Sequence, residues 1–352
     1  MTDLDDPAAL RAADPGDMLG AVTALPSQCG EGYRLGLEAR GLPSADGVLA
    51  VAFCGMGGSA VAGDVLCALA APRLRVPVTV VRTPELPEFA GPNALAVVCS
   101  YSGDTAETLA LFDQVTSRGV RAVAITSGGE LARRAQEYGD GCVRMPGGYM
   151  PRAAFGYMTL GMLGALEQIG LLPSFASDVD EAIREMERLI ARSGPAVPFS
   201  VESAKALALA LGERVPVVWG AEGIGAVAAT RWKTQLNENA KVPAFASALP
   251  ELDHNEVVGW APGRGDGFAL VALRHEGEHA DVAARFPASI EIARSSGASV
   301  REVWAEGRSP LARLLTLVLM GDLVSTYLAI ARGVDPSPID AIERLKDVLA
   351  QA

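Results

Sequence analysis

The sequence predicts an α/β protein built on mainly parallel sheets. Three observations carry this prediction: apolar runs of strand length alternate with helical patterns, the alternation occurs twice, and in each half a Gly-containing loop directly follows an apolar strand. The chain has 352 residues, enough for two domains that each bury a core. We therefore expect two similar α/β/α sandwiches, each with a mainly parallel sheet flanked by helices.

The first half shows the alternation clearly. Continuous apolar runs predict buried strands, and longer periodic stretches predict the helices between them. The Pro- and Gly-containing segment 146–151 interrupts the pattern and predicts a linker. In chain order we expect strands at 48–54, 78–81, 95–99 and 122–126, with helices at 59–69, 105–116 and 130–136.

The second half repeats the pattern after two connecting helices, 154–168 and 178–192. Ser309 is placed to cap a long apolar helix, and Gly333 is placed to end it. We expect strands at 215–219, 268–273 and 299–304, and helices at 224–239, 280–294, 310–332 and 341–350. The predicted divisions are an N-terminal subdomain at 1–150, connecting helices at 151–198 and a C-terminal subdomain at 199–352.

The composition is typical of a soluble, cytoplasmic protein. Residues 1–17 are acidic and lack the basic-then-apolar order of a signal peptide. The apolar run 310–331 contains Arg313 and Asp322, and two charges in mid-span favour a buried helix over a membrane span. The five cysteines form no C-x-x-C pair, which indicates reduced thiols. We therefore expect no membrane partner.

The net charge of −12 argues against a nucleic-acid partner, because such partners require a basic surface. The same charge repels an anionic substrate at long range. Backbone N–H groups, hydroxyls and a few placed cations would have to hold such a substrate locally.

The segment Gly55-Met-Gly57-Gly58-Ser59-Ala60 lies between a predicted strand and a predicted helix. Small residues there allow backbone N–H groups to surround an anion at the positive end of the helix. The segment also fits the G-x-G-x-x-A form of the dinucleotide fingerprint, so a nicotinamide-dependent dehydrogenase is an alternative. A tight turn without a ligand is a further alternative.

A second loop, Ser100-Tyr-Ser102-Gly-Asp-Thr105, also opens a helix after a strand. Its three hydroxyls suit the oxygens of a phosphomonoester, although Ser100 and Ser102 could simply cap the helix. A dinucleotide fold needs one such loop, and the second strand leads into Arg82-Thr-Pro instead of a ribose-binding acid. The two loops together therefore favour a phosphorylated small molecule.

Histidine is rare, with three in the chain. His275 and His279 form a literal H-E-x-x-H, but a glycine interrupts it and a strand directly precedes it, so we expect a solvated loop and no metal. His254 lies in a polar cluster after a predicted helix that would present Glu238 from its last turn. A carboxylate and an imidazole suffice for proton transfer beside a carbonyl. Two polar side chains that simply face solvent would account for both residues equally well.

These segments together resemble the bifunctional phosphoglucose/phosphomannose isomerase family of the sugar isomerase (SIS) domain superfamily. The resemblance covers nearly the whole chain from Gly55 onward and is most specific between Asn-Glu-Asn-Ala-Lys at 237–241 and Asp-His-Asn-Glu at 253–256. It implies two SIS-type subdomains and an aldose–ketose isomerisation of glucose-6-phosphate or mannose-6-phosphate to fructose-6-phosphate. The other segments that carry it are 55–60, 100–105, 151–157 and 231–245.

The resemblance also implies roles for individual residues. Glu238 would move the proton between C1 and C2 through a cis-enediol, and Arg152 would stabilise the enediolate. His254, supplied by the partner subunit of a dimer, and Lys346 would help to open the sugar ring. The residues implied for phosphate binding are Gly57, Gly58, Ser59, Ser100, Ser102 and Thr105. The resemblance implies no metal and no nucleotide cofactor.

Two positions depart from the family pattern. Asp104 stands where Asn is expected, and a carboxylate beside a phosphate is unfavourable unless it points away. Ser337 stands where Thr is expected, near the region thought to admit mannose. A non-catalytic sugar-phosphate-binding SIS regulator remains the alternative, although binding alone does not require Glu238, Arg152 and His254 together.

Overall fold

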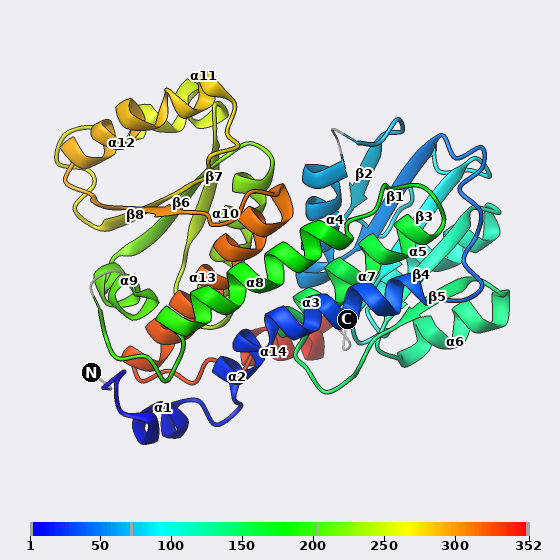
Figure 1. The fold of residues 1–352 in the computed structure, drawn as a ribbon, viewed down its shortest axis with the longest axis horizontal. Helices are drawn as coiled ribbons and strands as arrows, with labels where there is room; N and C mark the ends of the chain where they lie inside the picture. The colour runs from blue at the N-terminus through cyan, green and yellow to red at the C-terminus, as the bar shows by residue number, and fades with distance from the viewer. Residues whose placement is uncertain (1–2, 71–72, 201–202, 350–352) are drawn as a thin grey trace. The chain divides into compact units, whose positions relative to one another are not determined.

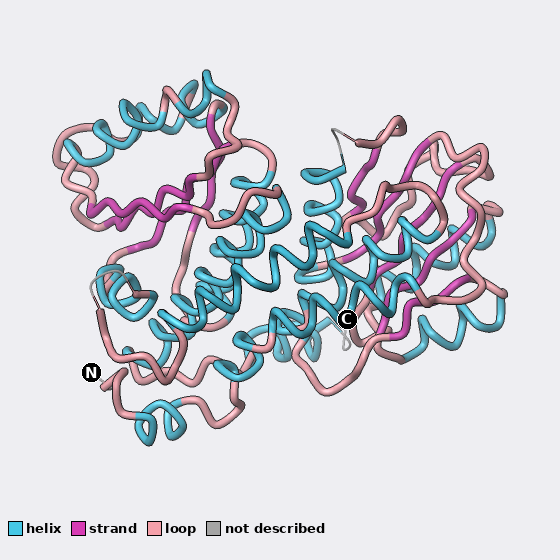
Figure 2. Tube along the Cα trace, viewed as in Figure 1, coloured by secondary structure: helices cyan, strands magenta, loops and turns pink. Residues whose placement is uncertain are grey.

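The computed structural model describes residues 3–70, 73–200 and 203–349. The chain forms two compact units: residues 24–187 with 306–316, and residues 1–23 with 188–305 and 317–352. We call them the first-sheet unit and the second-sheet unit. Helices α8 (Ala176–Ser193) and α13 (Pro310–Ala331) contribute residues to both. Figures 1 and 2 show a group of strands with surrounding helices in each unit.

The first-sheet unit contains a fully parallel sheet in the order β2-β1-β3-β4-β5. The three central strands are almost completely buried, as continuous apolar runs predict for a sheet covered on both faces. The strands are β1 (Ala50–Gly55), β2 (Val78–Val81), β3 (Ala94–Cys99), β4 (Arg121–Thr126) and β5 (Gly141–Arg144).

Right-handed crossovers decide which helices cover which face of this sheet. The chain runs from β1 to β2 in one direction and from β3 through β4 to β5 in the other, so α4 lies on the face opposite α5 and α6. Helices α3 and α7 pack closely together, because a Cβ at Gly36 would lie 2.2 Å from the Gly161 carbonyl oxygen. The helices are α3 (Leu25–Leu37), α4 (Gly57–Ala70), α5 (Ala106–Ser117), α6 (Gly129–Tyr138) and α7 (Phe155–Gln168).

The second-sheet unit contains a parallel sheet in the order β7-β6-β8-β9. One face packs on α12 around buried Trp219, Leu270 and Phe286. On α10, the buried guanidinium of Arg231 forms an ion pair with Asp322 of α13 at 2.8 Å. The elements are β6 (Val215–Ala221), β7 (Phe245–Leu249), β8 (Phe268–Arg274), β9 (Ser299–Trp304), α9 (Ala204–Leu211), α10 (Ile224–Glu238), α11 (Ala280–Ala283), α12 (Phe286–Ser295) and α14 (Asp340–Leu349).

The N-terminal segment of the second-sheet unit contains α1 (Pro7–Ala13) and α2 (Met18–Thr23), which the sequence patterns did not indicate. Lys205, 1% exposed, holds this segment through an ion pair of 2.9 Å with Asp5. Its ammonium also donates to the Val197 carbonyl at 2.7 Å. Because a buried ammonium needs such acceptors, the lysine is structural.

Most predicted elements are confirmed to within a few residues, and so is the α/β fold class. Ser309 caps α13 by accepting from the Ala312 N–H at 3.1 Å, and Gly333 ends the helix with φ 69°. The expected helix at 280–294 is instead two helices, because Pro287 begins a separate one. The strands β5 and β7 are additional; the predicted end of the last helix at residue 350 lies outside the described residues.

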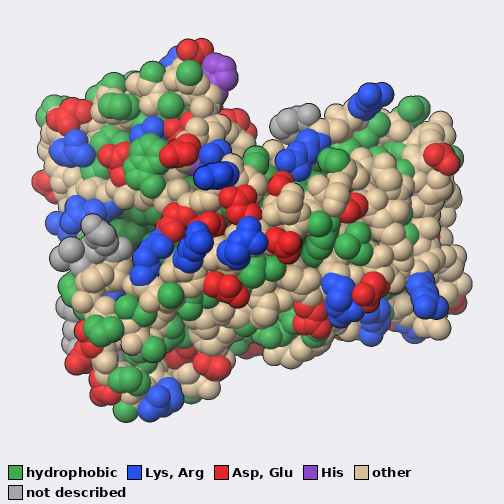
Figure 3. All heavy atoms as spheres, viewed as in Figure 1, with side chains coloured by type: hydrophobic (Ala, Val, Ile, Leu, Met, Phe, Trp, Pro, Cys, Tyr) green, Lys and Arg blue, Asp and Glu red, His purple; other side chains and the backbone are tan. Residues whose placement is uncertain are grey.

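Helix α13 is long and apolar enough to cross a membrane, but 94% of its most apolar window is buried within the structure. That degree of burial is typical of a core helix, as the charges of Arg313 and Asp322 in mid-span predict. On the face shown in Figure 3, acidic and basic side chains are interspersed, so that face presents no continuous basic field.

Candidate active site

Both predicted phosphate loops lie at the carboxyl edge of the first sheet. They follow β1 and β3, which are adjacent strands whose connections leave in opposite directions. Parallel sheets bind ligands in the crevice outside such a switch point. The fold therefore places Gly57, Gly58 and the 100–105 loop where an anion would be bound.

The 100–105 loop is organised by its own hydroxyls. The Ser100 and Thr105 hydroxyl oxygens are 3.0 Å apart, and Ser100 also accepts from the Gly103 N–H at 3.1 Å. Ser102 is exposed and accepts from the Asp104 N–H at 3.3 Å. Gly103 has φ 82°, and a Cβ there would lie 2.0 Å from the Gly128 carbonyl oxygen, so the loop requires glycine at this position.

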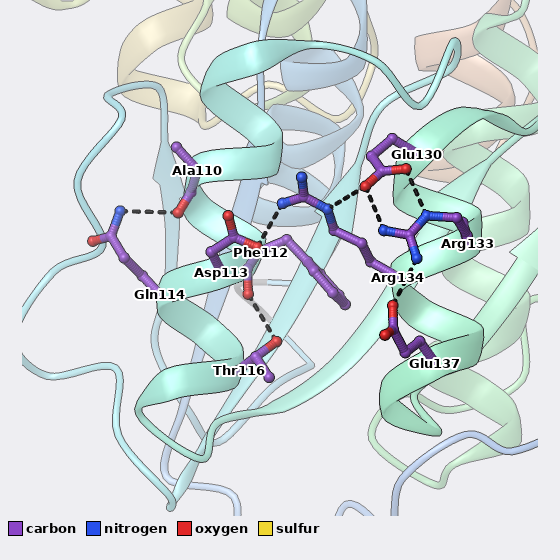
Figure 4. A network of polar contacts seen from close by, with 9 residues as sticks. All are labelled: Ala110, Phe112, Asp113, Gln114, Thr116, Glu130, Arg133, Arg134 and Glu137. Carbon is purple, nitrogen blue, oxygen red and sulfur yellow. Dashed lines mark hydrogen bonds and ion pairs between the residues drawn. The ribbon is translucent and has the colours of Figure 1, made fainter.

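Asp104 points away from the loop that carries it. Its Oδ1 accepts from the Glu130 N–H at 2.8 Å, which caps the start of α6. Glu130 in turn pairs with Arg133 and Arg134, and Arg134 reaches Asp113 of α5 (Figure 4). Hydrogen bonds from Arg133 and then Arg134 lower the pKa of Glu130 to about 2. The carboxylate at position 104 therefore serves a structural purpose.

Arg152 lies next to the first predicted phosphate loop, residues 55–60. Arg152 is 3% exposed in a short 3-10 helix, Pro151–Ala153, and a Cβ added to Gly58 would lie 3.5 Å from the Arg152 Cα. The Tyr101 hydroxyl donates to the Pro146 carbonyl and accepts from the Tyr149 N–H, both at 3.0 Å. Tyr101 thus fixes the approach to Arg152 from within the second loop.

Ser59 has a different environment from the other predicted phosphate ligands. Its side chain is buried, and its hydroxyl donates to the Met158 sulfur on α7 at 3.3 Å. Gly57 is exposed and has φ 52°, a conformation that glycine adopts without strain. The exposed backbone of Gly57 is therefore better placed for an anion than the Ser59 hydroxyl.

Glu238 is the last residue of α10 and lines a cavity of about 420 Å³ in the second-sheet unit. Buried polar contacts hold α10 on α13: the Trp232 indole donates to the Leu317 carbonyl at 2.7 Å, and the Asn239 amide donates to the Ser325 hydroxyl at 3.1 Å. These contacts fix the end of the helix that carries Glu238. The other residues lining the cavity are Asn237, Lys241 and 338–342.

Lys241 clamps this end of α10. Its ammonium donates to the Glu238 carbonyl at 2.5 Å and to the Pro336 carbonyl at 3.0 Å. Lys241 itself has φ 56°, an unusual conformation for a residue with a long side chain. The clamp joins the helix of Glu238 to the segment before α14. Sequence patterns miss it, because a left-handed backbone at a lysine has no compositional signal.

Lys346 lies on α14, one helical turn after Ile342, which lines the same cavity. The helix is exposed along its length, including its apolar side chains Ile342, Leu345, Val348 and Leu349. Ser337, buried at the approach to α14, has its N–H bonded to Asp335 at 2.9 Å.

His254 lies apart from Glu238 within one chain. Helix α10 joins the parallel strands β6 and β7, so Glu238 is at the edge of the sheet where β7 begins. His254 ends the 3-10 helix Glu251–His254, which follows the other end of β7. A five-residue strand separates these edges by roughly 17 Å. The imidazole is exposed.

The H-E-x-x-H sequence does not form a zinc helix. His275 directly follows β8, and His279 precedes α11 and accepts from the Asp281 N–H at 3.2 Å. The expectation of a solvated loop was wrong for His275, which is 5% exposed, and right for His279. Within residues 3–70, 73–200 and 203–349, no group of three or more His, Cys, Asp or Glu side chains is arranged to hold a metal.

Comparisons with known proteins extend these observations. Residues 200–349 match the model of the bacterial phospho-glucose isomerase C-terminal SIS domain. The bifunctional phosphoglucose/phosphomannose isomerase of Caldicellulosiruptor bescii is 34% identical over 95% of this chain and 99% of its own length. That of Aquifex aeolicus is 35% identical over 85% of this chain and 90% of its own length.

Among solved structures, tagatose-6-phosphate ketose/aldose isomerase from Escherichia coli is similar with a TM-score of 0.62 and 15% identity, covering 94% of this chain and 93% of its own. At that identity the likeness concerns the fold alone. Both quoted sequence relatives are named as isomerases, and neither favours the non-catalytic alternative. The chain belongs to the bifunctional phosphoglucose/phosphomannose isomerase family.

Proposed function

We propose that this protein interconverts glucose-6-phosphate and mannose-6-phosphate with fructose-6-phosphate in the cytoplasm. The observation that carries the proposal is that Glu238 lines a cavity next to the start of α14. Lys241 holds the end of the helix that carries Glu238 by donating to the Glu238 and Pro336 carbonyls. A fixed carboxylate at a cavity of sugar size is what a proton transfer between adjacent carbons requires.

In the proposed reaction, Glu238 removes the proton from C2 of the open-chain aldose. The C2–H electron pair forms the C1–C2 double bond of a cis-enediol, and the carbonyl oxygen at C1 takes a proton. Glu238 then returns its proton to C1 while the C2 hydroxyl loses its own, which gives the ketose. Arg152 stabilises the negative charge that develops on the enediolate oxygens.

Substrate binding uses the first-sheet unit. The amide groups at Gly57 and Gly58 and the hydroxyls of Ser100, Ser102 and Thr105 hold the phosphate at the carboxyl edge of β1 and β3. Ser59 supports the loop and leaves the phosphate to its neighbours, because its hydroxyl donates to Met158 and its N–H donates to the Met56 carbonyl at 3.1 Å. The charge on Asp104 does not oppose binding, since its carboxylate caps α6.

We propose that ring opening uses His254 and Lys346 and that the active site is shared between two subunits of a homodimer. Two observations support this arrangement: His254 and Glu238 lie beyond opposite ends of β7, and α14 exposes an apolar stripe near Lys346. A second copy of the chain would bring an exposed His254 to the Glu238 cavity and cover apolar surface at the same time.

The test is the variant Glu238→Gln, which keeps the shape of the side chain but removes the base. We expect turnover to fall by about 10²- to 10⁴-fold, the usual contribution of a general base, while the far-ultraviolet circular dichroism and melting temperature stay unchanged. Asp281→Asn is the matched control, because Asp281 is an exposed carboxylate on α11 of the same unit. An active, folded Glu238→Gln enzyme would contradict the assignment of the base.

A further inference from the structure

The imidazole of His254 is held only indirectly. Among the residues that the structure describes, none forms a hydrogen bond or ion pair with it, and the side chain is exposed. Its position therefore depends on the backbone on either side, which forms two short 3-10 helices, Glu251–His254 and Glu256–Gly259. We call residues 250–260 the histidine loop.

The histidine loop is fastened to α12 on the side preceding His254. Asp253 accepts from the buried Ser289 hydroxyl at 2.7 Å, and Arg285 approaches the same carboxylate at 3.4 Å. Leu252, 2% exposed, is part of the core between the sheet and α12. This side of the loop is therefore anchored by both packing and hydrogen bonding.

The part of the histidine loop that follows His254 is held by the carboxylate of Glu256. Glu256 Oε1 accepts from the Trp219 indole N–H at 2.8 Å and from the Trp260 indole N–H at 3.3 Å. Trp219 is completely buried in the middle of β6, and the two indoles form a T-shaped pair with ring centroids 5.7 Å apart. Glu256 thus connects the loop to a rigid part of the sheet, and its N–H is bonded to Asn255 Oδ1 at 2.6 Å.

We propose that Glu256 is a positioning residue for the ring-opening step: by accepting from both indoles it fixes where the His254 imidazole stands. The inference rests on the proposed function, in which His254 assists ring opening. A displacement of about 1 Å of a catalytic group can cost on the order of 10²-fold in rate. Removing the hydrogen bonds between Glu256 and the two indoles should therefore slow ring opening and leave proton transfer by Glu238 intact.

The test compares a substrate that must be opened with one that has no ring. Fructose-6-phosphate is cyclic in solution, whereas 5-deoxyfructose-6-phosphate lacks the hydroxyl that closes the furanose and stays open-chain. For Glu256→Ala we expect kcat/KM to fall at least tenfold on fructose-6-phosphate and to change less than twofold on the acyclic substrate. Glu256→Gln keeps an acceptor for the indoles and should recover most of the loss.

Two further variants keep the test decisive. Trp219→Phe removes the shorter hydrogen bond and leaves Glu256 in place, so it should show the same selective loss even if Glu256→Ala does not fold. Asp281→Ala is the matched control, because that carboxylate is 87% exposed at α11. Equal losses on both substrates, or no loss on either, would overturn the positioning role.

The reference variant His254→Gln separates this inference from the proposed function. If His254→Gln slows only the cyclic substrate, the ring-opening role stands and the Glu256 variants decide the positioning role. If His254→Gln slows neither substrate, the ring-opening role fails and the inference fails with it, while Glu238→Gln still tests the isomerisation on its own.

Discussion

Lys241 shows how a single side chain can fix the geometry of the predicted base. Its ammonium bonds to carbonyls at the end of α10 and at Pro336, and its backbone adopts a left-handed conformation to reach them. A left-handed conformation at a residue other than glycine costs about 1 kcal/mol or more and persists only where surrounding contacts determine it. The three carbonyl contacts of the ammonium are contacts of that kind.

We predict that Lys241→Met lowers kcat at least tenfold with little change in KM, because the base loses its alignment while the phosphate loops are untouched. Lys241→Gly removes the backbone strain together with the clamp. It should be about 1 kcal/mol more stable than Lys241→Met in urea unfolding and equally slow. A Lys241→Gly enzyme with wild-type kcat would show that the clamp has no part in catalysis.

At the same scale, sequence patterns identify residue types better than they identify contacts. Glu238 and His254 can be identified in the sequence because they lie in recognisable motifs. The loop 100–105 can be identified because its hydroxyl side chains follow a strand and precede a helix. The cap formed by Asp104 on α6 joins residues distant in sequence, so no local pattern contains it. The hydrogen bond between Glu256 and Trp219 is also non-local, since it crosses from a loop to the middle of a strand.

At the scale of elements, two hydrogen bonds join α6 to the second phosphate loop: the Asp104 cap on Glu130, and the Leu131 N–H, which donates to the Gly103 carbonyl at 2.9 Å. We predict that Asp104→Ala costs about 1 kcal/mol in free energy of unfolding, the usual value for loss of an N-terminal cap. It should also raise KM for sugar phosphates, because the 100–105 loop loses one of its two hydrogen bonds to α6. Asp104→Asn retains the accepting oxygen and should behave as wild type; a raised KM in that variant would assign the carboxylate charge itself to binding.

The ion-pair network between α5 and α6 gives a prediction for pH dependence (Figure 4). The folded pKa of Glu130 is lowered from 4.5 to about 2, so the stability this carboxylate contributes is present above pH 4.5 and lost as pH falls toward 2. Glu130→Gln should therefore unfold at lower urea than wild type at pH 7, and the difference should shrink between pH 4.5 and 2.

The control for that experiment is Glu107→Gln, an exposed carboxylate at the start of α5. Urea is preferable to guanidinium chloride, because salt screens exposed ion pairs. A wild-type-to-variant difference that is independent of pH would mean that the network contributes nothing through ionisation of Glu130.

Helices and strands could be predicted from the sequence where the run of apolar residues was long. Buried strands such as β3 and the long helix α13 have continuous apolar runs with defined ends. The strand β5 has four residues and begins at a glycine, so its pattern is too short to recognise. Strand β7 is an edge strand with partly exposed residues and lacks a continuous apolar run. Short edge strands are specified by their neighbours more than by composition.

At the scale of the whole molecule, the repeated alternation predicted two α/β sheets, and the structure confirms both. No sequence signal indicated that residues 1–23 belong with the second sheet, because their placement depends on tertiary contacts such as that of Asp5 with buried Lys205. A shared active site is likewise a property that a single chain does not display, and it needs its own test.

We predict that mixing two inactive variants restores activity. Glu238→Gln and His254→Gln should each be slow alone. In a mixed dimer, one of the two sites would combine an intact Glu238 with the partner's intact histidine, so unfolding and refolding an equimolar mixture should recover about one quarter of wild-type activity. No recovery, with dimers verified by sedimentation, would contradict the shared site, because two sites that each take Glu238 and His254 from the same chain would both stay inactive.

The central claim is that this chain isomerises hexose 6-phosphates, and a direct assay tests it. The protein, treated with chelator, is incubated with fructose-6-phosphate while glucose-6-phosphate and mannose-6-phosphate are followed separately by coupled reactions. We expect both products to form at rates unaffected by the chelator. If neither product forms, yet fructose-6-phosphate raises the melting temperature, the chain binds the sugar phosphate without isomerising it and the role given to Glu238 is wrong.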